Sequence, residues 1–297
     1  MKPSPHIRLA VSLGLLAGTF GCAPAISGSA GGIATPAVLS AKELTTELNH
    51  LQLPRGKDGT TAAEDRDRPT TEEVAAYLRN VISDLDATWG DFFKRLGLPH
   101  RKLTSVLVTP QQGRAVSQCQ EPARVIVIRY DTPNAVFCGA DQRSPAGAGT
   151  IYLPVTTLQK VWEGDIFGKR IPSREAGDHS AAIIVAHEYA HYVTDELRWQ
   201  FQQRWVTYPN PTGKWNELLA DCMAGVWAAH THITPHDVNE SVIALRSIGD
   251  YDYNSPDHHG TPEERMNAVL VGFNGIPGRY APRTPAACVA KYWKTTA

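Results

Sequence analysis

The sequence predicts an α+β domain in which a small β-sheet precedes a group of helices. Three short runs rich in β-branched and other apolar residues lie at 103–108, 124–130 and 150–155, separated by loops that contain Gly, Pro and Asn. Such runs are typical of strands. From residue 180 onward the pattern changes to that of helices. Strands that come before the helices favour an α+β arrangement over alternating α/β units.

The composition is that of a folded protein with balanced charge. With 297 residues, of which 42% are hydrophobic, the chain can build a sizeable core. Lys and Arg together number 29 against 30 acidic residues, which gives a net charge of −1. Because such a chain has no strong field to attract nucleic acid, we expect no nucleic-acid partner.

Residues 1–22 have the layout of a secretory signal. A short basic stretch precedes an apolar run at 9–20, which is too short and too rich in glycine to favour a permanent membrane span. Cys22 follows a small residue, as in a bacterial lipoprotein signal, where the cysteine is lipidated and anchors the protein to the membrane surface. Thr19 and Phe20 depart from the usual pattern of that signal. We therefore expect an exported protein, either a lipoprotein of the cell envelope or a secreted one.

Residues 23–69 predict a flexible tether. The stretch RGKDGTTAAEDRDRP has almost no apolar side chain to bury. Within the tether, Ser40 and Glu43 form a capping-box pattern that predicts one short helix over 40–51.

The folded domain is expected over 70–297, and it begins with a long amphipathic helix. Thr70 and Glu73 form a capping box, and apolar residues then recur at steps of three and four as far as Leu96. A Gly and a Pro follow shortly and end the helix. Later helices are predicted at 180–198, about 215–232, 235–248 and 261–273, the last two beginning at Thr-Pro pairs.

Four cysteines remain if Cys22 carries a lipid. They are Cys119, Cys138, Cys222 and Cys288. An even number in an exported chain predicts two disulfides, and four cysteines allow three pairings that the spacing alone does not separate.

The stretch AHEYAHY at 186–192 contains the pattern HExxH. On a helix, His187 and His191 lie on one face, so both imidazoles can reach one metal ion with Glu188 beside it. The flanking residues are apolar, which predicts a buried helix, and buried imidazoles next to a carboxylate need a partner that compensates their desolvation. Zinc is such a partner. The motif alone leaves open an ordinary helix that contains two histidines.

The stretch NELLADCMAGVWAA offers a third ligand. A catalytic zinc site usually has three protein ligands and one open position, and Glu217 lies on the next predicted helix. Asp221 is four residues further on the same face, where it can hydrogen-bond a ligand histidine and fix its tautomer. The alternative role of Glu217, an acid that stabilises the first turn of its helix, is less favoured because HExxH lies upstream.

Several motifs in the same order resemble the neutral zinc metallopeptidases of bacteria, a family of the zincin group that takes a glutamate as third ligand. The resemblance rests on VAHEYAHYV, on ELLADCMAGVWAAH, on FCGADQ followed by TIYLP, and on HHGTPEERMNAVLVGF, which together cover about residues 119–288. It implies a zincin-like α+β domain that binds one zinc ion per chain and hydrolyses peptides. The chain departs from the family pattern at Ala190, Tyr192 and Leu219, where Gly, His and Gln are usual.

The resemblance also implies roles for individual residues. His187, His191 and Glu217 would be the zinc ligands, Glu188 the general base, and Asp221 the partner of His187. It further implies the disulfide pairs Cys119 with Cys138 and Cys222 with Cys288.

A zinc peptidase also needs a second donor to the oxyanion that forms during hydrolysis. His259 is our candidate, with His258 and Tyr251 as further ones; the alternative is that His259 is a turn residue before Gly260. The run TIYLP is a candidate edge strand for binding an extended peptide or protein substrate.

Two other functions remain open. The chain could be a catalytically inactive, zinc-binding surface lipoprotein that binds a protein partner, and the presence of Glu188 argues against this. It could also be a zinc hydrolase that acts on substrates other than peptides, since a zinc-bound water attacks other acyl and phosphoryl centres as well.

Overall fold

The computed structural model describes most of the expected folded domain and little of what precedes it. Every described residue belongs to one compact unit, Pro36–Ala297. The expected signal with Cys22, and most of the tether with its expected helix, lie outside the described residues. The described residues are 45–46, 48, 52–53, 68–117, 119, 125–139, 141, 147–204, 211–231, 233–253 and 258–294.

A three-stranded sheet has the strand order β1-β5-β4. β5 (Thr150–Pro154) lies in the middle, parallel to β1 (Thr104–Val108) and antiparallel to β4 (Val136–Cys138). All residues of β5 are buried, which is typical of a strand covered on both sides. The expectation that TIYLP forms a substrate-binding edge is therefore wrong, because this run is the central strand and β4 is an edge.

The remaining strands form two short ribbons. β2 (Arg114–Ser117) pairs with β3 (Ile126–Arg129), and β6 (Asp165–Ile166) pairs with β7 (Lys169–Arg170), all antiparallel. The expected strand at 124–130 thus corresponds to β3, but it pairs with β2 outside the main sheet.

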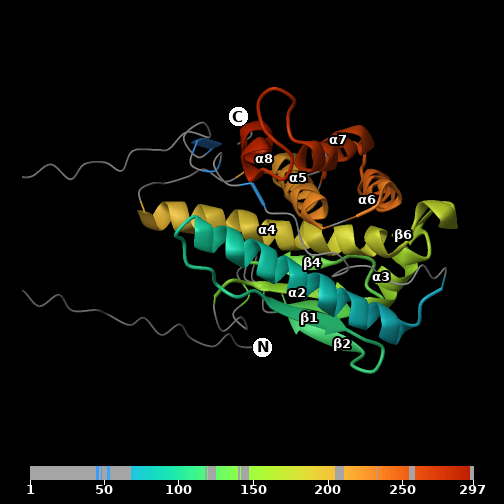
Figure 1. The fold of residues 1–297 in the computed structure, drawn as a ribbon. Helices are drawn as coiled ribbons and strands as arrows, with labels where there is room; N and C mark the ends of the chain where they lie inside the picture. The colour runs from blue at the N-terminus through green and yellow to red at the C-terminus, as the bar shows by residue number, and fades with distance from the viewer. Residues whose placement is uncertain are drawn as a thin grey trace, which may run out of the picture. The chain divides into compact units, whose positions relative to one another are not determined.

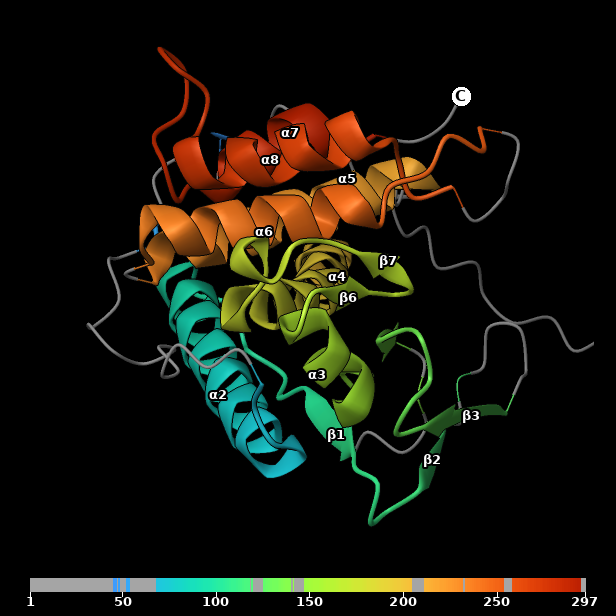
Figure 2. The ribbon, with the colours of Figure 1, turned by 90° about the vertical axis from the view of Figure 1, so that its right-hand side faces the viewer.

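The long helix α4 (Asp178–Arg204) organises the domain. In Figures 1 and 2, α2 (Thr71–Arg95), α3 (Val155–Trp162) and the sheet lie on one side of α4, and four later helices lie on the other. The 3₁₀ turn η1 (Ser173–Glu175) precedes α4. The later helices are α5 (Lys214–His230), α6 (Pro235–Ser247), α7 (Pro262–Asn274) and α8 (Pro285–Tyr292). This arrangement confirms the α+β class.

The helix starts follow the capping signals of the sequence. Thr70 with Glu73 and Thr261 with Glu264 form complete capping boxes, each side chain accepting a hydrogen bond from the other residue's backbone N–H. Thr234 begins α6 in the same way, with an aspartate as its partner. These boxes satisfy backbone donors that would otherwise lack partners in the first turn.

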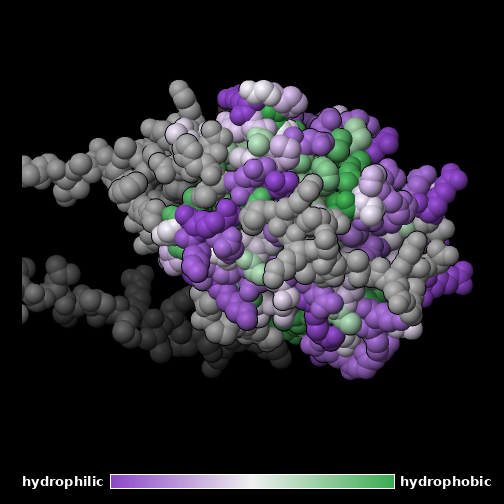
Figure 3. Space-filling view, viewed as in Figure 1, coloured by the Kyte–Doolittle hydropathy of each residue, from purple (hydrophilic) through white to green (hydrophobic). Residues whose placement is uncertain are grey.

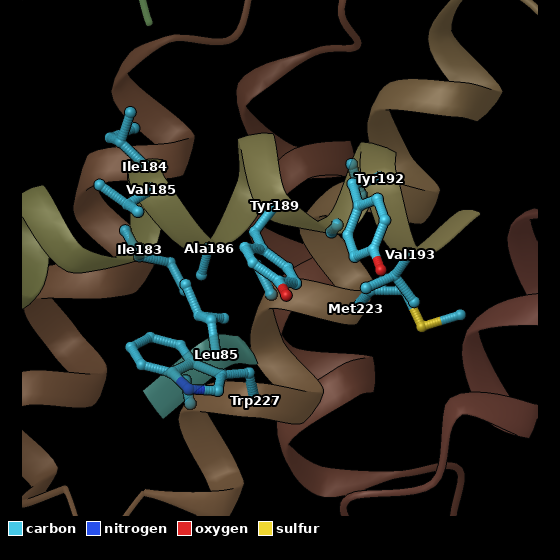
Figure 4. Packing of buried hydrophobic residues seen from close by; sticks show 14 of the residues in the cluster. Leu85, Ile183, Ile184, Val185, Ala186, Tyr189, Tyr192, Val193, Met223 and Trp227 are labelled. Carbon is cyan, nitrogen blue, oxygen red and sulfur yellow. The ribbon is translucent and has the colours of Figure 1, made fainter. Parts of the chain in front are cut away.

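The core surrounds residues 181–186 of α4, which are all apolar and buried. Figure 4 shows Leu85 of α2 and Trp227 of α5 gathered with Ile183 and Ala186 of α4 in one buried cluster. A helix that is apolar on every side is a buried one. Its burial fixes the position of the histidines that follow on the same helix.

Two disulfides brace the domain. Cys119 is bonded to Cys138 at the end of β4, and Cys222 of α5 is bonded to Cys288 of α8. The second bridge lies next to Asp221, so it ties the C-terminal helix to the helix that carries Glu217.

The face of the molecule drawn in Figure 3 is mostly polar where it is coloured. Its hydrophobic side chains form small groups. Within the described part of the chain, no helix is both long and apolar enough to cross a membrane.

Candidate metal centre

The two histidines of HExxH lie one turn apart on α4 and face the same space. The ring centroids of His187 and His191 are 4.8 Å apart. His187 is buried and His191 is half-buried. This spacing follows from the i, i+4 relation on a helix, which places the two side chains on one face.

Glu217 reaches the same space from the first turn of α5. Its Oε2 lies 3.2 Å from His187 Nε2, and its Oε1 lies 3.5 Å from His191 Nε2. One ligand atom from each of the three residues falls within 4.8 Å of the others. Both carboxylate oxygens thus face the imidazoles, as expected for a carboxylate that binds the same metal ion as the two histidines. Two imidazole nitrogens and one carboxylate are a donor set that fits a catalytic zinc ion, and a cleft borders the remaining side.

A buried ion pair holds His187 in this orientation. Asp221 Oδ1 lies 2.8 Å from His187 Nδ1, and Arg265 donates two hydrogen bonds to Asp221, from Nε to Oδ2 at 2.9 Å and from Nη2 to Oδ1 at 2.8 Å. Asp221 is 0% exposed and Arg265 is 1% exposed. With Nδ1 protonated and donating to Asp221, the Nε2 lone pair is free to bind a cation. Arg265 belongs to the stretch HHGTPEERMNAVLVGF that carries the family resemblance, but nothing in that stretch identifies Asp221 as its partner.

Asn216 takes the corresponding place beside His191. Its side-chain amide lies 3.2 Å from His191 Nδ1. Because the two ends of an amide can be exchanged by rotation, the amide oxygen can accept a hydrogen bond from Nδ1–H. Sequence reasoning missed this residue, and its only signal is the position directly before Glu217.

Glu188 lies beside the three candidate ligands, at the wall of the cleft. Its Oε2 accepts a hydrogen bond from the backbone N–H of Phe137 in β4 at 2.9 Å. Burial is the main cause that raises the pKa of Glu188 to about 7. By contrast, the adjacent imidazoles outweigh burial at Glu217 and lower the pKa of that carboxyl well below its usual value. Two carboxyls that line the same cleft therefore differ in proton affinity.

The cleft that opens onto these residues has a volume of about 720 Å³. β4 and the segment before it form one wall, from Pro133 to Phe137. The turn between β6 and β7 and the end of α6, with Ser247 and Ile248, lie along the cleft as well. A cleft of this size can hold several residues of an extended chain.

Comparison with known proteins agrees with this geometry. Residues 16–277 match the family described as "Putative neutral zinc metallopeptidase". The chain belongs to this family. Its relatives include the uncharacterized protein YpfJ of Escherichia coli strain K12 and that of E. coli O6:H1 strain CFT073, each 23% identical over 225 residues, which are 69% of this chain and 70% of the relative. No solved structure gives a significant match.

The positions where this chain departs from the usual pattern of the neutral zinc metallopeptidase family all lie in the core. Ala190, Tyr192 and Leu219 are each no more than 1% exposed. The Tyr192 hydroxyl donates to the backbone carbonyl of Arg101. None of the three lines the cleft or contributes one of the grouped ligand atoms. These departures therefore leave the candidate metal site of this family member intact.

The three candidate oxyanion donors lie in different surroundings. His259 lines the cleft, and 48% of its side chain is exposed. His258 Nδ1 forms a hydrogen bond with the Asp250 carboxylate. The exposed Tyr251 donates a hydrogen bond from its hydroxyl to Glu263. His258 and Tyr251 do not line the cleft. His259 is therefore the one of the three that a substrate in the cleft can reach.

Proposed function

We propose that this protein is an exported, zinc-dependent endopeptidase, with Glu188 as general base. The observation that carries the proposal is the convergence of His187 Nε2, His191 Nε2 and the Glu217 carboxylate beside Glu188 in an open cleft. His187, His191 and Glu217 would hold one zinc ion, which when bound polarises a water molecule and lowers its pKa to about 7.

Glu188 would move the proton in both halves of the reaction. It accepts a proton from the attacking water and returns it to the amine that leaves. A raised pKa, here about 7 through burial, suits a group that has to gain and lose a proton near neutral pH. The Phe137 N–H holds one carboxylate oxygen and so limits rotation of the side chain.

The orientation of β4 favours a peptide as substrate. Phe137 lies opposite Ile151 in the pairing with β5, yet its N–H points to Glu188. The other edge of β4 therefore faces the cleft and the base. An extended peptide can add to such an edge by main-chain hydrogen bonds, which gives a peptide an advantage over other acyl or phosphoryl compounds. His259 would then donate to the oxyanion of the peptide bond that is cleaved.

Export is supported by the two disulfides, which form and persist in oxidising compartments. The pattern of residues 1–22 adds the proposal that Cys22 is lipidated and holds the enzyme at the membrane surface of the cell envelope. Its substrates would then be peptides or proteins outside the cytoplasm. The alternative is an inactive surface lipoprotein that binds zinc and a protein partner.

Peptide hydrolysis by the Glu188→Gln protein separates these two functions. A peptide library is incubated with zinc-loaded wild type and with the zinc-loaded variant, and cleavage is followed by mass spectrometry. We expect cleavage by the wild type, its loss in Glu188→Gln, and equal zinc contents, because the base is not a ligand. A wild type that binds zinc but cleaves no peptide would favour the binding protein, and an active Glu188→Gln protein would refute the assigned base.

A further inference from the structure

A second cluster of metal-binding side chains lies away from the HExxH site, where the start of α4 meets the start of α6. Asp178 and His179 come from the first turn of α4, and Asp237 and Glu240 come from the first turns of α6. His179 Nδ1 is 3.2 Å from Asp178 Oδ1 and 3.8 Å from Asp237 Oδ1. One ligand atom from each of the four residues lies within 4.8 Å of the others. His187 follows Asp178 by nine residues, or about 13 Å along the helix, so the two groups are separate.

Backbone donors orient two of the carboxylates. Thr234 N–H donates to Asp237 Oδ2 as part of the α6 capping box, and His179 N–H donates to Glu240 Oε2 at 3.1 Å. Gly177 lies so close that a Cβ there would be 2.2 Å from Glu240 Oε1. The chain thus has a glycine where the Glu240 carboxylate presses against the backbone. Ligands held in this way by outer hydrogen bonds are a feature of built metal sites.

Two acids of the cluster, Asp237 and Glu240, have no Lys or Arg as an ion-pair partner in the part of the chain that the structure describes. Glu240 is 3% exposed and His179 is 4% exposed. Within the described residues, Asp237 and Glu240 form ion pairs with histidines alone, namely His179 and the half-exposed His236. Buried carboxylates without a permanent cation are costly, because desolvation penalises the charged form.

One buried nitrogen of the cluster also lacks a partner. His179 is 4% exposed, and its Nε2 makes no hydrogen bond within the described part of the chain. The Tyr77 side chain, 94% buried, lies against the Asp178 carboxylate: burial is the main cause that raises the pKa of the phenol, followed by the charge of Asp178 and a hydrogen bond with it. Buried polar groups are nearly always satisfied by protein, water or an ion. The unpartnered His179 Nε2 therefore points to a ligand at this place.

We propose that Asp178, His179, Asp237 and Glu240 bind a second divalent cation of the zinc type. An imidazole among carboxylates suits zinc and related first-row cations, whereas calcium takes six to eight oxygen ligands. The ion neutralises the carboxylates and binds the buried imidazole of His179. It also joins α4 to α6, whose last residue Ser247 and C-cap Ile248 line the cleft, and so it fixes that wall relative to the HExxH helix.

The test isolates the second site in the full chain. The parent protein carries His187→Ala and His191→Ala, which remove both imidazoles of HExxH. It is saturated with zinc, freed of unbound metal by gel filtration, and measured by elemental mass spectrometry. We expect one zinc ion per chain and a Tm that rises with zinc, as for any ligand that binds the folded state. Calcium at the same concentration leaves the Tm unchanged.

The matched variants decide whether that zinc lies in the proposed site. Adding Asp178→Asn and Glu240→Gln to the parent removes the bound zinc, whereas Glu72→Gln with Asp91→Asn, two exposed acids of α2, leaves it in place. If the first combination does not fold, Asp178→Asn alone weakens zinc binding at least tenfold in a titration. A parent that binds no zinc, a response to calcium in place of zinc, or zinc that survives these substitutions overturns the proposal. None of these results depends on peptidase activity.

Discussion

Replacing Arg265 by Met should destabilise the metal-free protein strongly. Arg265 is 1% exposed and donates two hydrogen bonds to Asp221, which is 0% exposed. Met retains most of the aliphatic stem of the side chain but leaves a buried carboxylate without its cation. Removing one partner of a buried ion pair costs about 3–5 kcal/mol. We expect a loss of that size in the free energy of unfolding.

The chain offers a control with the same two residue types. Arg95 and Asp91 form an ion pair on the surface of α2, with side chains 33% and 51% exposed. Such pairs contribute about 0–1 kcal/mol, because water screens the charges and both side chains lose freedom when they pair. Arg95→Met should therefore change the unfolding free energy little.

Urea unfolding in the presence of a chelator measures both variants. With an m-value of roughly 3 kcal/mol per molar urea, Arg265→Met should lower the midpoint by about 1 M or more. In titrations, Arg265→Met should bind zinc 10–100-fold more weakly than the wild type, because Asp221 no longer holds His187 firmly. This is about the range found when a residue that hydrogen-bonds a metal ligand is lost. A midpoint for Arg265→Met equal to that of Arg95→Met would refute the view that this pair supports the site.

Two further predictions concern the reaction and the bridges. His259→Ala should lower kcat by about 10²–10³ and leave the zinc content unchanged, the expected cost of losing one oxyanion donor; a variant with wild-type kcat would assign His259 to the turn alone. Loss of the Cys222–Cys288 bridge, which spans 66 residues, should cost about 4 kcal/mol, against about 3 kcal/mol for the Cys119–Cys138 bridge, which spans 19. Urea unfolding of the two double-Ala proteins measures this order, and a smaller loss for the longer loop would contradict it.

The sequence predicted the parts of the fold that rest on local signals. Capping boxes begin α2 and α7 where the Thr-x-x-Glu patterns stand, because the box depends on residues three apart. The HExxH helix and the following acid helix were placed for the same reason: their periodicity is local and strong. Strands β1, β3 and β5 were found from apolar runs, but β2 and its pairing with β3 were not, because pairing depends on partners elsewhere in the chain.

Elements that are short or depend on distant partners were missed. β4 has three residues and no pattern of its own, yet it forms an edge of the sheet and contacts Glu188. α3 begins directly at the end of β5, and its first residue, the β-branched Val155, was counted as strand. α8 was not predicted, and it is held to α5 by a bridge over 66 residues.

The same limit applies to the site. HExxH is recognisable because its two histidines keep a fixed spacing on one helix, and Glu217 because it lies on the next predicted helix, in a stretch that resembles the family. The partner of Arg265 lies 44 residues away, and no rule of sequence connects the two. The second cluster joins residues about 60 positions apart at the starts of two helices, so only the fold brings it together.

The zinc content of the Glu217→Ala protein tests the central claim most directly. Wild type, Glu217→Ala and the control Glu72→Ala, an exposed acid of α2, are loaded with zinc in parallel and measured by elemental mass spectrometry. If His187, His191 and Glu217 hold a zinc ion, Glu217→Ala loses one equivalent relative to the wild type and the control loses none. Equal zinc in all three proteins would contradict the three-ligand site, and with it the zinc peptidase.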